Sequence, residues 1–269
     1  MRFLVFLCFL FAVNTAWSQS EALHENYFVT RDRVKIYYEI AGEGDPVLLV
    51  HGFVVNSQSW KKSALYKDLI SGGYKVIILD LRGNGKSDKP QKPESYTNDI
   101  EAKDIMQLMD KLKIDQYKVV GYSRGSIIAS RLLVLDKRVS SVVLGGMGAD
   151  FTNPEWPRRK LFYRALMGEP VEELKGFIDY VKTSGLDQKA LAYMQYGQPS
   201  TSTAELLEIK KPVLVICGTA DEDNGSSKTL ASMIPSSTYL RVPGDHNNTV
   251  HTDAFSQGVI QFLKTQDTK

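Results

Sequence analysis

The chain alternates between short apolar runs and amphipathic segments, and this alternation is the strongest constraint on its fold. Continuous apolar runs are typical of strands that are buried on both faces of a sheet. Amphipathic segments between them predict right-handed helical crossovers, and hence a mostly parallel sheet with helices on both faces. Strands are expected at 34–40, 46–52, 75–80, 117–122, 139–147, 211–218 and 238–242, and helices at 57–70, 98–113, 126–135, 226–234 and 252–265. The fold class is therefore α/β.

A helical insertion interrupts this pattern at about residues 150–208. An insertion between two sheet strands predicts a cap over the strand ends. Its basic run, Arg158-Arg159-Lys160, is interpreted as a solvated helix face rather than a membrane patch. Its aromatic residues are expected mainly to pack the cap onto the core, although some could line a pocket: Phe151, Trp156, Phe162, Tyr163, Tyr193 and Tyr196.

The composition limits the classes of partner. The 269 residues are 43% hydrophobic and 24% charged, which is ordinary for one large globular domain. A formal net charge of +2 creates no basic field that would attract nucleic acid or anionic lipid. We therefore expect a small-molecule ligand and no nucleic-acid partner, while the sequence leaves the oligomeric state open.

The first 18 residues have the pattern of a signal peptide. Arg2 precedes the apolar run "FLVFLCFLFAV", and Ala16 and Ser18 provide the small residues of a cleavage site before Gln19. The prediction is an exported, periplasmic or secreted domain over residues 19–269 with no stable membrane span after processing, because the apolar run is too short to cross a bilayer comfortably. An uncleaved anchor is the alternative.

The stretch "VVGYSRGS" at 119–126 has the pattern of a nucleophile elbow. A Gly-X-Ser-X-Gly motif alone is a weak signal, but here it follows an apolar strand and opens an amphipathic helix, which is the context an elbow requires. Small residues at Gly121 and Gly125 permit the tight bend, and the helix start points free amides at developing negative charge. Ser123 is the candidate nucleophile.

A serine hydroxyl needs a base and an orienting carboxylate. His246 follows the last predicted strand and should reach the same sheet edge as Ser123, whereas His251 is interpreted as a surface or capping residue. Asp221 follows the strand at 211–218 and completes the chain order Ser, Asp, His. The alternative acids are Glu222, Asp223 and Asp150.

Two backbone amides are candidates for an oxyanion hole. One belongs to Arg124, directly after Ser123, and the other to Phe53 in "HGF" after the strand at 46–52. His51 in the same stretch is expected to brace the turn.

Five motifs in this order resemble the α/β-hydrolase fold superfamily over nearly all of the chain after residue 18: "HGF" at 51–53, "DLRGNGKSDKP" at 80–90, "GYSRGS" at 121–126, "GTAD" at 218–221 and "GDH" at 244–246. The resemblance implies a mostly parallel, eight-stranded type of sheet with a helical cap. It also implies that Asp80, Arg82, Gly83, Gly85 and Ser87 belong to a structural loop. Ser123 separates the chain from relatives with Asp at the elbow, the dehalogenases and epoxide hydrolases.

Two residues depart from the usual family pattern. Arg124 stands where small or apolar residues are common, and its cation could select a carboxylate-bearing substrate or fold back into a salt bridge, the interpretation we favour. Ser126 replaces a frequent third glycine, which predicts slightly looser packing of helix on strand.

Together these features predict an exported serine hydrolase acting on a small or medium acyl substrate through an acyl-enzyme, with no metal and no cofactor. Carboxylesterase or lipase-like activity is the first expectation. Lactonase, thioesterase, carbon-carbon bond hydrolase, aminopeptidase and cofactor-free perhydrolase activities remain open, as do the acyl-chain length and, as a second class, a non-catalytic binding protein on the same fold.

Overall fold

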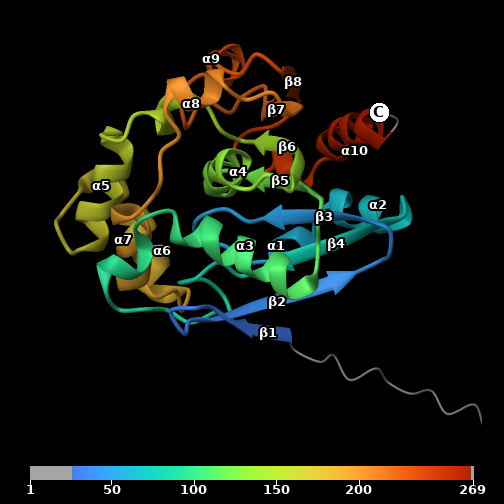
Figure 1. The fold of residues 1–269 in the computed structure, drawn as a ribbon. Coiled ribbons are helices and arrows are strands. Elements are labelled where there is room, and N and C mark those ends of the chain that lie inside the picture. The colour runs from blue at the N-terminus through green and yellow to red at the C-terminus, as the bar shows by residue number, and fades with distance from the viewer. Residues whose placement is uncertain (1–25, 268–269) are drawn as a thin grey trace, which may run out of the picture.

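A computed structural model of the chain describes residues 26–267. Its centre is one eight-stranded sheet, and the strands follow in the order β1 (Asn26–Val29), β2 (Lys35–Ala41), β4 (Tyr74–Leu79), β3 (Asp45–Val50), β5 (Tyr117–Tyr122), β6 (Val139–Gly145), β7 (Val213–Gly218) and β8 (Ser237–Val242) (Figure 1). The predicted α/β class is confirmed. The predicted signal peptide, residues 1–18, lies outside the described residues.

The sheet is parallel from β4 through β3, β5, β6 and β7 to β8, whereas β1, β2 and β4 pair antiparallel. The carboxyl ends of the parallel strands therefore meet along one edge, where open α/β sheets place their sites. The sequence analysis did not predict β1, because four residues with a mixed burial pattern give little periodicity to detect.

Helices cover both faces of the sheet. One face packs against α3 (Ile100–Leu112), α4 (Arg124–Leu135) and α9 (Ser227–Ser232). The other packs against α1 (Gln58–Lys61), α2 (Ala64–Ser71) and α10 (Asp253–Asp267). Each face has its own apolar core, because alternate residues of the buried strands point to opposite sides of the sheet.

Helix boundaries differ from the sequence expectation by up to two residues, and one predicted helix is split. The predicted helix 57–70 is two helices, because Ser63 breaks it and its side chain caps α2 by accepting a hydrogen bond from the Tyr66 amide. The helix after the elbow begins at Arg124 rather than Ser126.

The insertion between β6 and β7 is helical, as predicted. It contains η2 (Ala149–Thr152), α5 (Pro157–Leu166), η3 (Glu172–Leu174), α6 (Lys175–Thr183), α7 (Gln188–Tyr196) and α8 (Thr203–Leu207). In Figure 1, α5, α6 and α7 lie together at one side of the molecule, far from α2 and α10. A third apolar cluster joins this cap to Phe53 and Val54, which follow β3.

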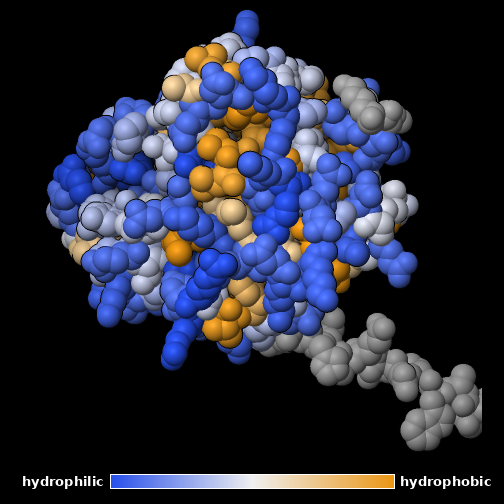
Figure 2. Space-filling model, viewed as in Figure 1, coloured by the Kyte–Doolittle hydropathy of each residue, from blue (hydrophilic) through white to orange (hydrophobic). Residues whose placement is uncertain are grey.

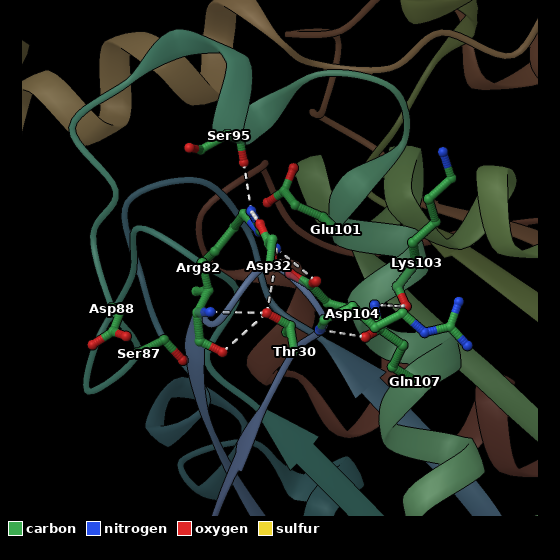
Figure 3. A network of polar contacts seen from close by, with 12 residues as sticks. Thr30, Asp32, Arg82, Ser87, Asp88, Ser95, Glu101, Lys103, Asp104 and Gln107 are labelled. Carbon is green, nitrogen blue, oxygen red and sulfur yellow. Dashed lines mark hydrogen bonds and ion pairs between the residues drawn. The ribbon is translucent and has the colours of Figure 1, made fainter.

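The loop at 80–90 is fixed by buried polar contacts. Arg82 is fully buried, and its guanidinium donates to both carboxylate oxygens of Asp104 at 2.6 and 2.7 Å. It also donates to Asp32 at 2.9 Å and to the Ser95 carbonyl oxygen at 2.6 Å (Figure 3). Asp80 accepts the amide of Ser57 at 2.8 Å. These contacts tie the loop to α3 and to the start of α1, in keeping with a structural role.

The visible surface is mainly hydrophilic, with hydrophobic residues running from the top of the view to its centre and a smaller group near the bottom (Figure 2). None of the helices within residues 26–267 combines the length and the apolar character that a bilayer crossing requires.

Candidate active site

The bend at Ser123 has the strained backbone of a nucleophile elbow. Ser123 adopts φ 54° and ψ −124°, in a region that side-chain-bearing residues rarely occupy. Its amide donates to the Gly145 carbonyl oxygen at 2.8 Å, which holds the bend against β6. Ser126 also donates its hydroxyl to that carbonyl, at 2.8 Å. The Ser126 side chain therefore adds a second hydrogen bond between the start of α4 and β6. Because this hydroxyl has a place against Gly145, the side chain fits without the looser packing of helix on strand that the sequence analysis expected.

Both glycines of the motif are required by close backbone approach. A Cβ on Gly121 would lie 2.4 Å from the Gly125 carbonyl oxygen, and a Cβ on Gly125 would lie 2.1 Å from the Val50 carbonyl oxygen. Each distance is well inside van der Waals contact, and the opposing atoms belong to the backbone. The helix can pack this closely on β3 and β5 only because these side chains are absent.

The structure brings Ser123, His246 and Asp221 together in one hydrogen-bonded chain. His246 Nε2 lies 2.9 Å from the Ser123 hydroxyl oxygen, and His246 Nδ1 lies 3.0 and 3.1 Å from the two Asp221 carboxylate oxygens. Ser123 and His246 are partly exposed, whereas Asp221 is buried. A carboxylate bonded to Nδ1 fixes the tautomer that presents an unprotonated Nε2 to the serine.

The alternative base and acids are not in this chain. His251 lies on η4 (Thr249–His251), is exposed, and has no recorded hydrogen bond from its ring within residues 26–267. Asp150, Glu222 and Asp223 are likewise exposed, and none of them bonds to the His246 ring in that range.

Tyr122 supports His246, a contact that the sequence analysis missed. Its hydroxyl donates to the His246 carbonyl oxygen at 2.8 Å, and the two rings lie 5.7 Å apart. Burial raises the pKa of Tyr122, so the phenol stays protonated and able to donate. No local motif marks this role, because the two residues lie 124 positions apart in the sequence.

The two candidate oxyanion donors border the same space. Phe53 and Arg124 both line the cavity around Ser123. Arg124 is the first residue of α4, where backbone amides have no partner within the helix. The loop carrying Phe53 is held by Asn84, whose side-chain amide donates to the carbonyl oxygens of Phe53 and Val55 at 2.8 and 3.1 Å.

The Arg124 side chain forms the salt bridge that the sequence analysis favoured. Its guanidinium donates to the two Glu101 carboxylate oxygens at 2.9 and 2.5 Å, and both residues are almost fully buried. The charge of Arg124 is therefore compensated by Glu101 inside the protein, while its Nε has no hydrogen-bond partner among the described residues.

His51 braces the loop after β3, as expected. Its Nδ1 lies 2.7 Å from the Gly52 carbonyl oxygen and its Nε2 lies 3.0 Å from the Leu81 amide. Burial lowers the pKa of this imidazole, which agrees with a neutral ring that accepts the Leu81 proton at Nε2.

A cavity of about 340 Å³ opens onto Ser123 and His246. Its walls come from the loops after β3, β5, β7 and β8 and from the cap. Apolar side chains form much of the lining: Phe53, Val54, Ile127, Met147, Trp156, Phe162, Phe177 and Val250. Of the six cap aromatics considered from sequence, only Trp156 and Phe162 lie in this wall. The volume suits a small ligand.

The cap also contributes polar groups that the sequence analysis did not place in the site. Arg158, Arg159, Gln195 and Gln198 line the cavity. Arg158 and Lys160 of the basic run are exposed to solvent, as a solvated helix face requires, whereas Arg159 is half-buried. Both arginines also border the cavity, which the sequence analysis did not predict. Residues 26–267 contain no cluster of three or more His, Cys, Asp or Glu side chains that could hold a metal ion.

Comparisons with known proteins agree with this architecture. The family described as alpha/beta hydrolase fold matches residues 45–169. A curated Synechocystis protein named "Putative non-heme chloroperoxidase" is 41% identical over 267 residues, covering 86% of this chain and 95% of that protein. This chain belongs to the α/β-hydrolase fold family.

Solved hydrolase-fold structures superpose on most of the chain. A bromoperoxidase from Bacillus anthracis aligns with a TM-score of 0.69 and 25% identity, covering 86% of this chain and 96% of the other. An esterase from Exiguobacterium antarcticum aligns with a TM-score of 0.74 and 20% identity, covering 89% of this chain and 99% of the other. The second likeness shows the fold alone.

Proposed function

We propose that this α/β-hydrolase is an exported serine hydrolase that cleaves a small or medium acyl ester through an acyl-enzyme. The observation that supports the proposal is the continuous hydrogen-bonded chain from Ser123 through His246 to Asp221, placed at the floor of an apolar cavity. Family membership supports a hydrolase, and the signal-peptide pattern of residues 1–18 supports export.

The geometry suggests how each group acts. His246 Nε2 removes the Ser123 proton as the serine oxygen attacks the ester carbonyl carbon, and the imidazolium then protonates the leaving alcohol. Water, deprotonated by the same nitrogen, cleaves the acyl-enzyme to a carboxylic acid and regenerates the serine. Asp221 orients the ring and stabilises its positive charge. The amides of Phe53 and Arg124 hold the negative oxygen of each tetrahedral intermediate.

Covalent labelling tests the nucleophile. The protein is exported from cells, incubated with a fluorophosphonate, and analysed by intact mass. We expect one label per chain on a mature protein that begins at Gln19, and no label on Ser123→Ala. Ser126→Ala is the matched control: this serine lies three residues away but is committed to Gly145, so the variant should still label. An unlabelled wild type, or a label that persists in Ser123→Ala, would refute the mechanism and favour a non-catalytic binding protein.

The Synechocystis relative's name favours a second candidate, a perhydrolase on the same triad. In that reaction hydrogen peroxide replaces water as the nucleophile that cleaves the acyl-enzyme, giving a peracid and free serine. The peracid oxidises a halide ion in solution and is itself reduced to the carboxylic acid. Halogenation of monochlorodimedone that requires acetate, peroxide and bromide together, and that Ser123→Ala lacks, is the expected result. Ester hydrolysis without such halogenation would eliminate this candidate.

A further inference from the structure

The cap side of the cavity carries two arginines without a carboxylate partner. Within residues 26–267, neither Arg158 nor Arg159 has an acidic oxygen within 4.0 Å. Arg159 is partly buried and donates only to carbonyl oxygens, those of Pro154 at 2.7 Å and Gln198 at 3.0 Å. Arg158 is exposed and lies 4.9 Å from the centre of the Phe162 ring. A partly desolvated guanidinium that retains its charge favours an anion beside it.

Two glutamine residues lie in the same wall. The side chains of Gln195 and Gln198 line the cavity although the residues are only 7% and 6% exposed. Neither side-chain amide has a hydrogen-bond partner among the residues that the structure describes. The amide atoms themselves are not among the fully buried polar atoms, so they remain accessible and free to bond with a ligand in the cavity.

The other charged side chains near the triad are those of Arg124, Asp221 and Asp223, of which the first two are paired. Arg124 is neutralised by Glu101, and Asp221 is bonded to His246. Asp223 lines the cavity but lies on the exposed loop after β7, not on the cap. Arg159 feels the Coulombic attraction of Glu155, but the Glu155 carboxylate is paired with Lys160, so the positive charge without a hydrogen-bonded carboxylate lies on α5.

We infer that the cap binds a carboxylate group of the substrate through Arg159, with the amides of Gln195 and Gln198 as further donors. The planar guanidinium matches a carboxylate, and the aromatic residues beside it enclose an apolar linker. The preferred substrate is then an ester or lactone that carries a carboxylate away from the bond being cleaved. This inference rests on the proposed function and narrows its substrate class.

Paired substrates of equal size test the inference. One pair compares mono(4-nitrophenyl) adipate with the 4-nitrophenyl ester of 6-amino-6-oxohexanoic acid, which places the charge on the acyl side. A second compares 4-acetoxybenzoate with 4-acetoxybenzamide, which places it on the alcohol side. In at least one pair, we expect kcat/KM for the anionic ester to exceed that for the neutral ester by about tenfold or more after correction for alkaline reactivity.

Variants of the cap assign this preference to its residues. Arg159→Met should lower the anionic-to-neutral ratio by about tenfold, Gln195→Leu should lower it less, and Arg159→Lys should retain part of it. Arg164→Met is the matched control, because Arg164 lies on the same helix but pairs with Glu169 outside the cavity. Its ratio should equal that of the wild type. Melting temperatures of all variants show whether the cap remains folded.

Binding separates the failure of this inference from the failure of the proposed function. Calorimetric titration with 4-acetamidobenzoate and 4-acetamidobenzamide, neither of which is an ester, reports charge selectivity without turnover. Tighter binding of the anion that is lost in Arg159→Met would support the inference even if no ester were cleaved. Ester hydrolysis with no anion preference, or a preference that survives both Arg159→Met and Gln195→Leu, would overturn it while leaving the hydrolase intact.

Discussion

Replacing His246 with alanine is expected to lower kcat/KM for an ester by about 10⁴-fold to 10⁶-fold. The imidazole is the group within hydrogen-bond distance of the Ser123 hydroxyl, at 2.9 Å, so its removal leaves the serine without a base. Asp221→Ala should cost less, because the ring retains its support from Tyr122 through the His246 backbone. Steady-state kinetics with 4-nitrophenyl esters measures both losses.

The double variant and a neighbouring histidine serve as controls for this prediction. If Ser123 and His246 act as one unit, Ser123→Ala combined with His246→Ala should be no slower than either single variant. His251→Ala should stay within about threefold of the wild type, because the exposed His251 does not contact the serine. A large loss of activity in His251→Ala together with a small loss in His246→Ala would show that the base is His251 and not His246.

Gly125→Ala is expected to destabilise the fold by about 3 kcal/mol or more. The added Cβ would lie 2.1 Å from the Val50 carbonyl oxygen and 2.8 Å from that of His51. Both atoms belong to the backbone at the end of β3, a central strand, so neither can turn away as a flexible side chain would. Relief requires α4 to move off the sheet, which also displaces Ser123. Urea denaturation followed by circular dichroism measures the loss, and fluorophosphonate labelling reports the state of the elbow.

Gly176→Ala is the matched control for this prediction. Gly176 lies in α6, and apart from its chain neighbours and the backbone of its own helix no heavy atom lies within 4 Å of the position that its Cβ would take. Alanine there should raise stability by about 0.5–1 kcal/mol, because it costs less conformational entropy than glycine in a helix. Equal urea midpoints for Gly125→Ala and the wild type would show that the elbow tolerates a side chain and that the close approach is not a constraint.

The architecture was largely predictable because its signals are local or periodic. Buried parallel strands need continuous apolar runs, and covering helices need one apolar face, so their order appears directly along the chain. Errors occurred for two different reasons. A single side chain, Ser63, splits the predicted helix 57–70, and the edge strand β1 is too short to show a clear periodicity.

By itself, the sequence determined which residues meet at the candidate site. The glycines around Ser123, and the positions of Asp221 and His246 after their strands, follow from backbone sterics and from the convergence of parallel strands at one edge. Only the tertiary structure decided where the charges go. Arg124 turns to Glu101, 23 residues earlier, and Arg159, half-buried, borders the cavity. The reason is physical: backbone geometry is set by neighbours in sequence, whereas the partner of a long charged side chain depends on how distant helices pack.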